Sequence, residues 1–183
     1  MRQIIFILIL INFNNLAFSS VKDDIISNLI KTDNLSFNFE QNINGKIETG
    51  NCIVEYPKKI FCRYRQENNK ILVSNGKSIV IKTNNGSYYI YRIKQTPLNY
   101  ILDKKFLINE IKNLKERIID DKFINFLIKK DNIEINLFFD IKNFDIIGWQ
   151  TLDIYQNLNI TYISFLKKNQ LLEKNIFTLP TQD

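Results

Sequence analysis

The stretch that decides the fold is FNFEQNINGKIETGNCIVEYPKKIFCRYRQENNKILVSNGK, residues 37–77. Apolar and polar residues alternate in short runs along it, and Gly, Pro and Asn residues interrupt the runs. Alternation with a period of two is typical of half-buried strands, and these interruptions are typical of tight turns. The stretch therefore predicts an antiparallel meander of short strands.

Two cysteines flank the turn predicted at Pro57. Residues equally distant from the centre of a hairpin turn pair with each other, which puts Cys52 opposite Cys62. The same pairing puts Val54 opposite Ile60, on the same face. Opposed cysteines come close enough to form a disulfide, which an oxidising compartment favours. The alternative is two buried free thiols that pack as small apolar groups.

Outside this stretch, helical and strand patterns follow each other without an internal repeat or linker. Acidic residues precede a first run of apolar residues at helical spacing, and Thr96-Pro97 is a typical helix start. We predict helices over 23–30, 97–102 and 106–114, and strands over 35–41, 46–56, 59–65, 70–74, 78–82, 87–93, 123–129, 133–139, 145–154, 158–166 and 175–179.

These elements predict an α+β fold built on a single curved antiparallel sheet. Such a sheet must bury one apolar face. It does so either by closing and filling itself with side chains, or by forming an incomplete β-barrel whose apolar cavity is covered by a helical lid. Composition and periodicity leave both arrangements open.

The N-terminus has the features of a secretory signal peptide. Arg2 precedes an apolar run from Ile4 to Ile11, and Ala17-Phe18-Ser19 is a small-residue cleavage site. We expect residues 1–19 to be removed and residues 20–183 to form one domain; the alternative is a buried N-terminal helix. Because no cysteine follows the cleavage site, we expect the mature protein to be unlipidated and located in the periplasm.

Composition excludes several classes of function. The formal net charge is +6, but Lys and Arg are scattered between apolar positions, which indicates a solvated surface rather than a nucleic-acid site. The chain has no histidine, so the usual Ser-His and Cys-His catalytic arrangements are excluded and no enzyme is predicted. With two cysteines and no histidine, neither a metal site nor a cofactor is expected.

Several motifs occur in an order that one family shares. They are F-x-F-x-Q at 37–41, the strand with Gly50, the Pro57 turn into an aromatic strand, ILVSNGK at 71–77 and T-P-L-x-x-I-L at 96–102. In this ordered set, the chain resembles the outer-membrane lipoprotein carrier protein family, LolA, over about residues 35–105.

The resemblance implies an incomplete β-barrel capped by helices, whose interior takes the acyl chains of a lipoprotein. It implies that an ABC-transporter complex of the inner membrane releases the lipoprotein to the carrier. The carrier then delivers it to an outer-membrane receptor, LolB, where the cell has one. We expect it to act as a monomer.

Inward alternation and the matched motifs give a set of residues expected to line the cavity. For each of them, the alternative is ordinary core packing. The set is Phe37, Phe39, Val54, Ile60, Tyr64, Tyr89, Tyr91, Leu98, Ile101, Leu102 and Trp149.

Two positions depart from the family pattern. Many family members have an arginine before the proline of the turn, thought to hold the lid closed, and here that residue is Tyr56. A tyrosine cannot form the paired hydrogen bonds of a guanidinium, so this lid contact is not expected. Cys62 stands where the family has an aromatic residue.

The alternative function is a periplasmic lipid-sensing regulatory domain with the same barrel-like fold. Regulators of this kind carry a second domain after the barrel. The length of 183 residues therefore favours the carrier.

Overall fold

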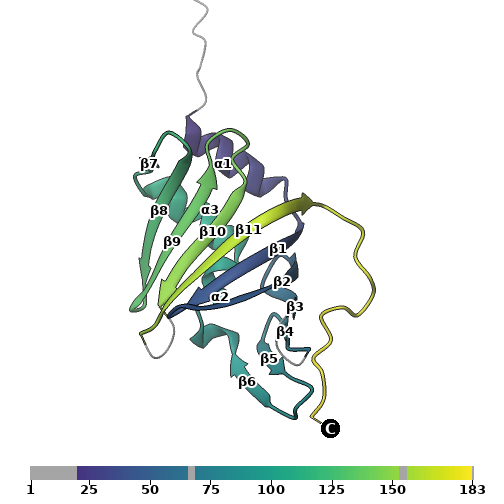
Figure 1. Cartoon of the computed structure of the whole chain (residues 1–183). Helices are drawn as coiled ribbons and strands as arrows, with labels where there is room; N and C mark the ends of the chain where they lie inside the picture. The colour runs from purple at the N-terminus through teal and green to yellow at the C-terminus, as the bar shows by residue number, and fades with distance from the viewer. Residues whose placement is uncertain (1–19, 66–68, 153–155, 183) are drawn as a thin grey trace, which may run out of the picture.

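The computed structural model describes residues 20–65, 69–152 and 156–182. The predicted signal peptide, residues 1–19, lies outside the described residues. In the described part of the chain, eleven strands form one open antiparallel sheet with helices on its concave side (Figure 1). The predicted fold class, a single curved sheet that does not close, is confirmed.

The sheet has the strand order β6-β5-β4-β3-β2-β1-β11-β10-β9-β8-β7. Two meanders therefore meet where β1 pairs with β11, antiparallel like every other pair. The strands are β1 Asn34–Ile43, β2 Lys46–Glu55, β3 Lys59–Tyr64, β4 Ile71–Asn75, β5 Ser78–Lys82, β6 Tyr88–Arg92, β7 Arg117–Ile119, β8 Phe123–Lys130, β9 Ile133–Asp140, β10 Ile146–Leu152 and β11 Leu158–Lys168.

The β2–β3 hairpin has the register that its sequence predicts. Cys52 pairs with Cys62 and Val54 with Ile60, across a turn that contains Pro57. The two cysteines have Cα atoms 4.1 Å apart and are joined by a disulfide.

The helices carry the chain from one edge of the sheet to the other. β6 and β7 are consecutive in sequence but lie at opposite edges. The connection consists of the 3-10 helix η1 Ile93–Gln95, α2 Leu98–Ile101 and α3 Lys104–Asn113. It crosses the concave face, because its ends lie at the two edges (Figure 1).

The N-terminal helix α1, Val21–Ile30, joins α3 on the concave side. Ser20 caps it: the Ser20 hydroxyl accepts from the Asp23 N–H, and the Asp23 carboxylate accepts from the Ser20 backbone N–H. The Asn28 side chain donates to Asp145 Oδ1 at 2.8 Å, which ties α1 to the turn before β10.

Over the β8–β10 half, the concave face is filled by side chains. Alternate residues of β8 and β9 are completely buried, as expected where a sheet face packs against helices. They are Ile124, Phe126, Ile128, Ile135, Leu137 and Phe139. Of the two arrangements left open by the sequence, the sheet adopts the unclosed one: side chains fill this half of the concave face, and a cavity lies over the other half.

The strand prediction for residues 175–179 is wrong. Residues 174–177 form turns, and Asn175 has a positive φ of 64°, which does not fit a strand. The segment runs outside the sheet and is tied by side chains: the Tyr88 hydroxyl donates to the Pro180 carbonyl at 2.9 Å. β7 was not predicted because its three residues are too short to show alternation.

We predict that replacing both cysteines, Cys52→Ala with Cys62→Ala, lowers the free energy of unfolding by about 2–3 kcal/mol, because the bridge restricts the unfolded chain. Urea unfolding of the two proteins measures the difference. A thiol-reactive label should modify neither cysteine in unfolded, unreduced protein. Labelling of that sample would contradict the bridge.

Candidate functional site

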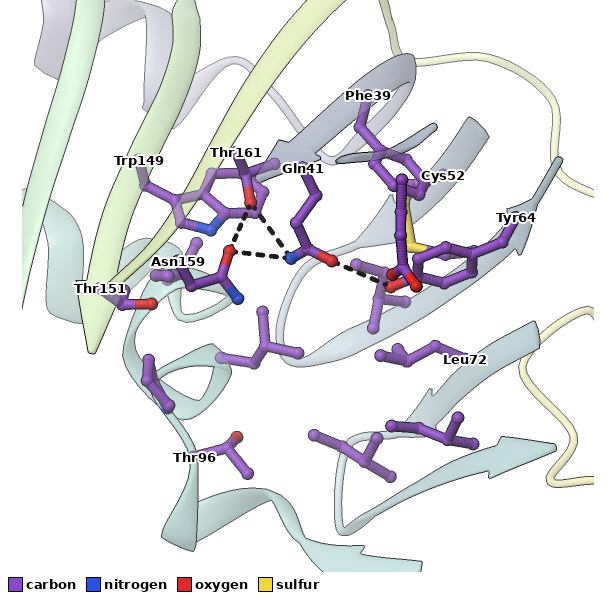
Figure 2. A pocket seen from close by; sticks show the side chains of 18 of the residues that line it. Phe39, Gln41, Cys52, Tyr64, Leu72, Thr96, Trp149, Thr151, Asn159 and Thr161 are labelled. Atoms are coloured by element: carbon purple, nitrogen blue, oxygen red, sulfur yellow. Dashed lines mark hydrogen bonds between the residues drawn. A yellow bond between two sulfur atoms is a disulfide. The ribbon is translucent and has the colours of Figure 1, made fainter. Parts of the chain in front are cut away.

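A cavity of about 360 Å³ lies between the concave face and α2. Its walls come from β1 to β6, from β10 and β11, and from the segment 96–101 (Figure 2). Cross-strand neighbours on this face follow from the registers, for example Trp149 beside Thr161 and Thr161 beside Gln41. The cavity is therefore built by the inward positions of the two meanders together with the crossing segment.

Most of the residues predicted to line a cavity are on its wall. They come from β1, β3, β6, β10 and α2, and most of their side chains are apolar. They are Phe37, Phe39, Ile60, Tyr64, Tyr91, Leu98, Ile101 and Trp149.

Three predicted residues lie elsewhere. Val54 and Leu102 are each 2% exposed and belong to the hydrophobic core instead of the cavity wall. Tyr89 is 52% exposed, since it lies on β6, which is an edge strand of the sheet formed by the described residues. Strand alternation and helical spacing predict which face a residue lies on, but they do not predict how deep the residue is buried or how far it lies from a sheet edge.

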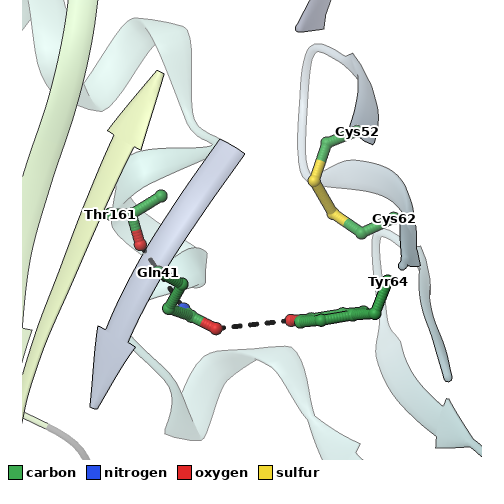
Figure 3. The surroundings of a disulfide bond; sticks show 5 residues. All are labelled: Gln41, Cys52, Cys62, Tyr64 and Thr161. Carbon is green, nitrogen blue, oxygen red and sulfur yellow. Dashed lines mark hydrogen bonds between the residues drawn. A yellow bond between two sulfur atoms is a disulfide. The ribbon is translucent and has the colours of Figure 1, made fainter. Parts of the chain in front are cut away.

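Other apolar wall residues were missed by the sequence analysis. Leu72, Ile79 and Ile81 extend the wall across β4 and β5. The two cysteines also line the cavity, so the disulfide is part of its surface (Figure 3). The signal that could have found them is register: Leu72 pairs with Cys62, and Ile81 with Leu72.

The Phe39 ring packs directly over Gly50 of β2, where a side chain would collide with it. A Cβ atom built at Gly50 would lie 2.6 Å from a ring carbon of Phe39 and 2.2 Å from the Arg63 carbonyl oxygen. No side chain fits at those distances. The ring also makes an edge contact with Tyr64, with centroids 5.0 Å apart. The glycine thus orients an aromatic pair on the cavity wall.

A row of polar side chains crosses the apolar wall. The Gln41 amide donates to Asn159 Oδ1 at 3.0 Å and to Thr161 Oγ1 at 3.4 Å, and it accepts from the Tyr64 hydroxyl at 3.5 Å (Figures 2 and 3). Thr151 lies directly opposite Asn159 in the β10–β11 register and also lines the cavity. The sequence analysis missed this row.

A buried ion pair borders the polar row. Glu48 is 5% exposed, and its carboxylate lies 2.6 Å from Lys70 Nζ and 3.3 Å from Lys46 Nζ. Lys70 Nζ also lies 3.9 Å from the centroid of the Tyr64 ring. Both Glu48 and Lys70 line the cavity, so this part of the wall is charged and the rest is neutral.

The roof over the cavity is α2, which presents Leu98 and Ile101 to it. Polar contacts hold the C-terminal end of this helix to the β2–β3 turn. The Lys58 backbone N–H donates to the Leu102 carbonyl at 2.7 Å, and Lys58 Nζ lies 3.2 Å from Asp103 Oδ2. On the other side, the Tyr100 hydroxyl donates to Asp131 at 2.6 Å, a hydrogen bond that raises the Tyr100 pKa.

The sequence matches a family model over residues 31–180, described as outer membrane lipoprotein carrier protein LolA. The chain belongs to the LolA family. Among the curated proteins, none matches it.

Several solved structures resemble this chain at low sequence identity. An uncharacterized conserved protein from Thermus thermophilus has a TM-score of 0.52 at 9% identity, covering 87% of this chain and 92% of that chain. A LolA superfamily protein from Nitrosomonas europaea gives 0.48 at 9% identity, covering 87% and 96%. A chain of the MucA/MucB complex from Pseudomonas aeruginosa gives 0.48 at 10% identity, covering 88% and 62%.

None of the helices in the described part of this LolA-family chain has the length and apolar content needed to cross a bilayer.

Among the described residues, the Tyr56 side chain makes no hydrogen bond to α2, the roof of the cavity. Its ring packs against the hydrophobic core, and burial raises the pKa of its phenol, so the side chain stays neutral. Lys104 Nζ lies 5.8 Å from the ring centroid. The contact with the end of α2 is made two residues later, by Lys58.

We predict that Lys70→Met lowers the free energy of unfolding by about 1–3 kcal/mol, because it removes the nearest partner of the buried Glu48 carboxylate. The control is Lys46→Met, since the Lys46 side chain is 62% exposed; we expect an effect within about 0.5 kcal/mol. Urea denaturation measures both. Equal losses from the two variants would contradict this assignment.

We predict that Lys58→Met speeds amide hydrogen exchange in α2 by up to about fivefold, because a half-buried ion pair is worth up to about 1 kcal/mol. The control is Lys59→Met, which breaks the 3.1 Å pair with Glu55 on the same hairpin. Hydrogen exchange followed by mass spectrometry should leave α2 unchanged in the control. If exchange in α2 is the same in both variants, Lys58 does not hold the roof.

Proposed function

We propose that this protein is a periplasmic carrier for lipoproteins. It binds the acyl chains of lipoproteins released by an ABC-transporter complex of the inner membrane and delivers them to a LolB-like receptor of the outer membrane. The observation that carries the proposal is the largely apolar cavity under α2, in a chain of the LolA family. The carrier forms and breaks no covalent bond, so no catalytic group is required.

The energetics of acyl chains explain why the cavity is apolar. Each CH₂ group removed from water contributes about 0.8 kcal/mol. Exposing several acyl chains to water therefore costs tens of kcal/mol, and the carrier must cover them with an apolar surface. The apolar wall residues on β1, β3, β5 and α2 supply part of that cover.

Binding of several acyl chains requires the roof, α2, to move. A cavity of about 360 Å³ is at the small end of ligand sites, so several acyl chains require more space than this conformation offers. Moving α2 provides this space, because the helix has only four residues and the polar contacts described above lie in its C-terminal half and just after it. Cargo that binds the open form better shifts the population toward it.

We predict that Leu98→Glu weakens binding of a synthetic diacyl lipopeptide at least tenfold, because it puts a carboxylate into the apolar cavity. The control is Leu158→Glu, on the outer face of β11, where Leu158 is already 46% exposed. Trp149 is the sole tryptophan and lines the cavity, so its fluorescence reports binding. Unchanged affinity of Leu98→Glu would place the lipid elsewhere.

A cellular experiment separates carriage from lipid sensing. Depletion of a carrier should leave lipoproteins in the inner-membrane fraction, whereas depletion of a regulatory domain should change gene expression and leave their distribution unchanged. The readout is the ratio of a lipoprotein in the two membrane fractions. A normal distribution after depletion would contradict the proposal.

A further inference from the structure

The polar row on the cavity wall includes hydrogen-bond donors that point into the cavity. Asn159 Oδ1 accepts from the Gln41 amide at 3.0 Å and from the Thr161 hydroxyl at 3.5 Å. With its oxygen used in this way, the amide nitrogen of Asn159 points into the cavity (Figure 2). In the described part of the chain, no acceptor takes a hydrogen bond from that nitrogen.

Thr151 adds a hydroxyl beside this amide. The two residues are direct cross-strand partners, and Thr151 is 6% exposed although its side chain lines the cavity. Its hydroxyl has no hydrogen-bond partner among the described residues. Two N–H groups and one O–H group thus converge on one place in a largely apolar cavity, where unmet donors are costly.

The chemistry of these groups defines what they would bind. Both side chains are neutral, and the nearest charged residues of the cavity, Glu48 and Lys70, are paired with each other at 2.6 Å. A cluster of neutral donors suits a neutral acceptor, such as a carbonyl oxygen, better than an anion that would need a counter-charge.

We propose that Asn159 and Thr151 form a subsite for the ester or amide carbonyl oxygens through which acyl chains are attached to their cargo. The proposal rests on the carrier function given above. Thr151 lies at the end of β10 far from α1, whereas the start of β10 is tied to that helix by Asn28 and Asp145. Acyl chains bound to this subsite extend from it over the apolar wall toward Phe37 and Cys52.

Two matched lipopeptides test the subsite. One carries two acyl chains through esters, and the other carries the same chains through ethers, which lack the carbonyl oxygens. We expect wild-type protein to bind the ester form about tenfold more tightly, as one or two hydrogen bonds would give. Trp149 fluorescence measures both affinities. In Asn159→Leu, which keeps the Thr151 hydroxyl, the ester-to-ether ratio should fall to about three.

The controls separate the subsite from the carrier function. Asn136→Leu makes the same change at the position of β9 opposite Gln150, on the outer face, and should keep the wild-type ratio. Thr151→Val is nearly isosteric and should lower the ester-to-ether affinity ratio about threefold. It replaces Asn159→Leu as the test if that variant does not fold. Equal binding of both lipopeptides by wild type would overturn the subsite and leave the carrier intact; binding of neither would overturn both.

Discussion

The constraint on which the structure depends is the connection from β6 to β7. The pairing of β1 with β11 joins the two meanders in the middle of the sheet, which leaves the consecutive strands β6 and β7 at opposite edges. A chain of about two dozen residues must then span the sheet. It can cover the concave face only by burying apolar residues there, and Leu98, Ile101, Leu107 and Ile111 do this. The roof of the cavity is thus a consequence of topology.

The helices cover the two halves of the concave face unequally. Helices of ten residues, α1 and α3, lie on one side and pack against each other, and the sheet there is filled by completely buried side chains. The four residues of α2 are too few to fill the space over the other half. Space therefore remains under α2, and the disulfide and the Lys58 contacts hold the hairpin that borders it.

The sequence predicted this architecture where local signals are strong. Alternation and the turn residues predicted the strands of the first meander, and the Pro57 turn predicted the register of the β2–β3 hairpin, with Cys52 opposite Cys62. What failed depends on long-range context. Val54 and Leu102 have the same apolar character as true wall residues, and only the packing of the helices puts them in the core. The segment 175–179 is apolar enough for a strand, but β11, the strand it follows, is already paired on both sides.

The polar row was missed although its positions follow the same alternation. Gln41 is two residues beyond Phe39 on the inward face, and a search for apolar residues alone discards it. Its contribution to binding is small beside that of the chains: a hydrogen bond gives about 1 kcal/mol net, whereas burial of acyl chains gives tens. Donors of that strength can determine which end of a lipid lies at β10 and β11 while adding little to its affinity. A carrier that has to release its cargo needs weak orienting hydrogen bonds of this kind, because breaking them adds little to the free energy required for the lipid to leave.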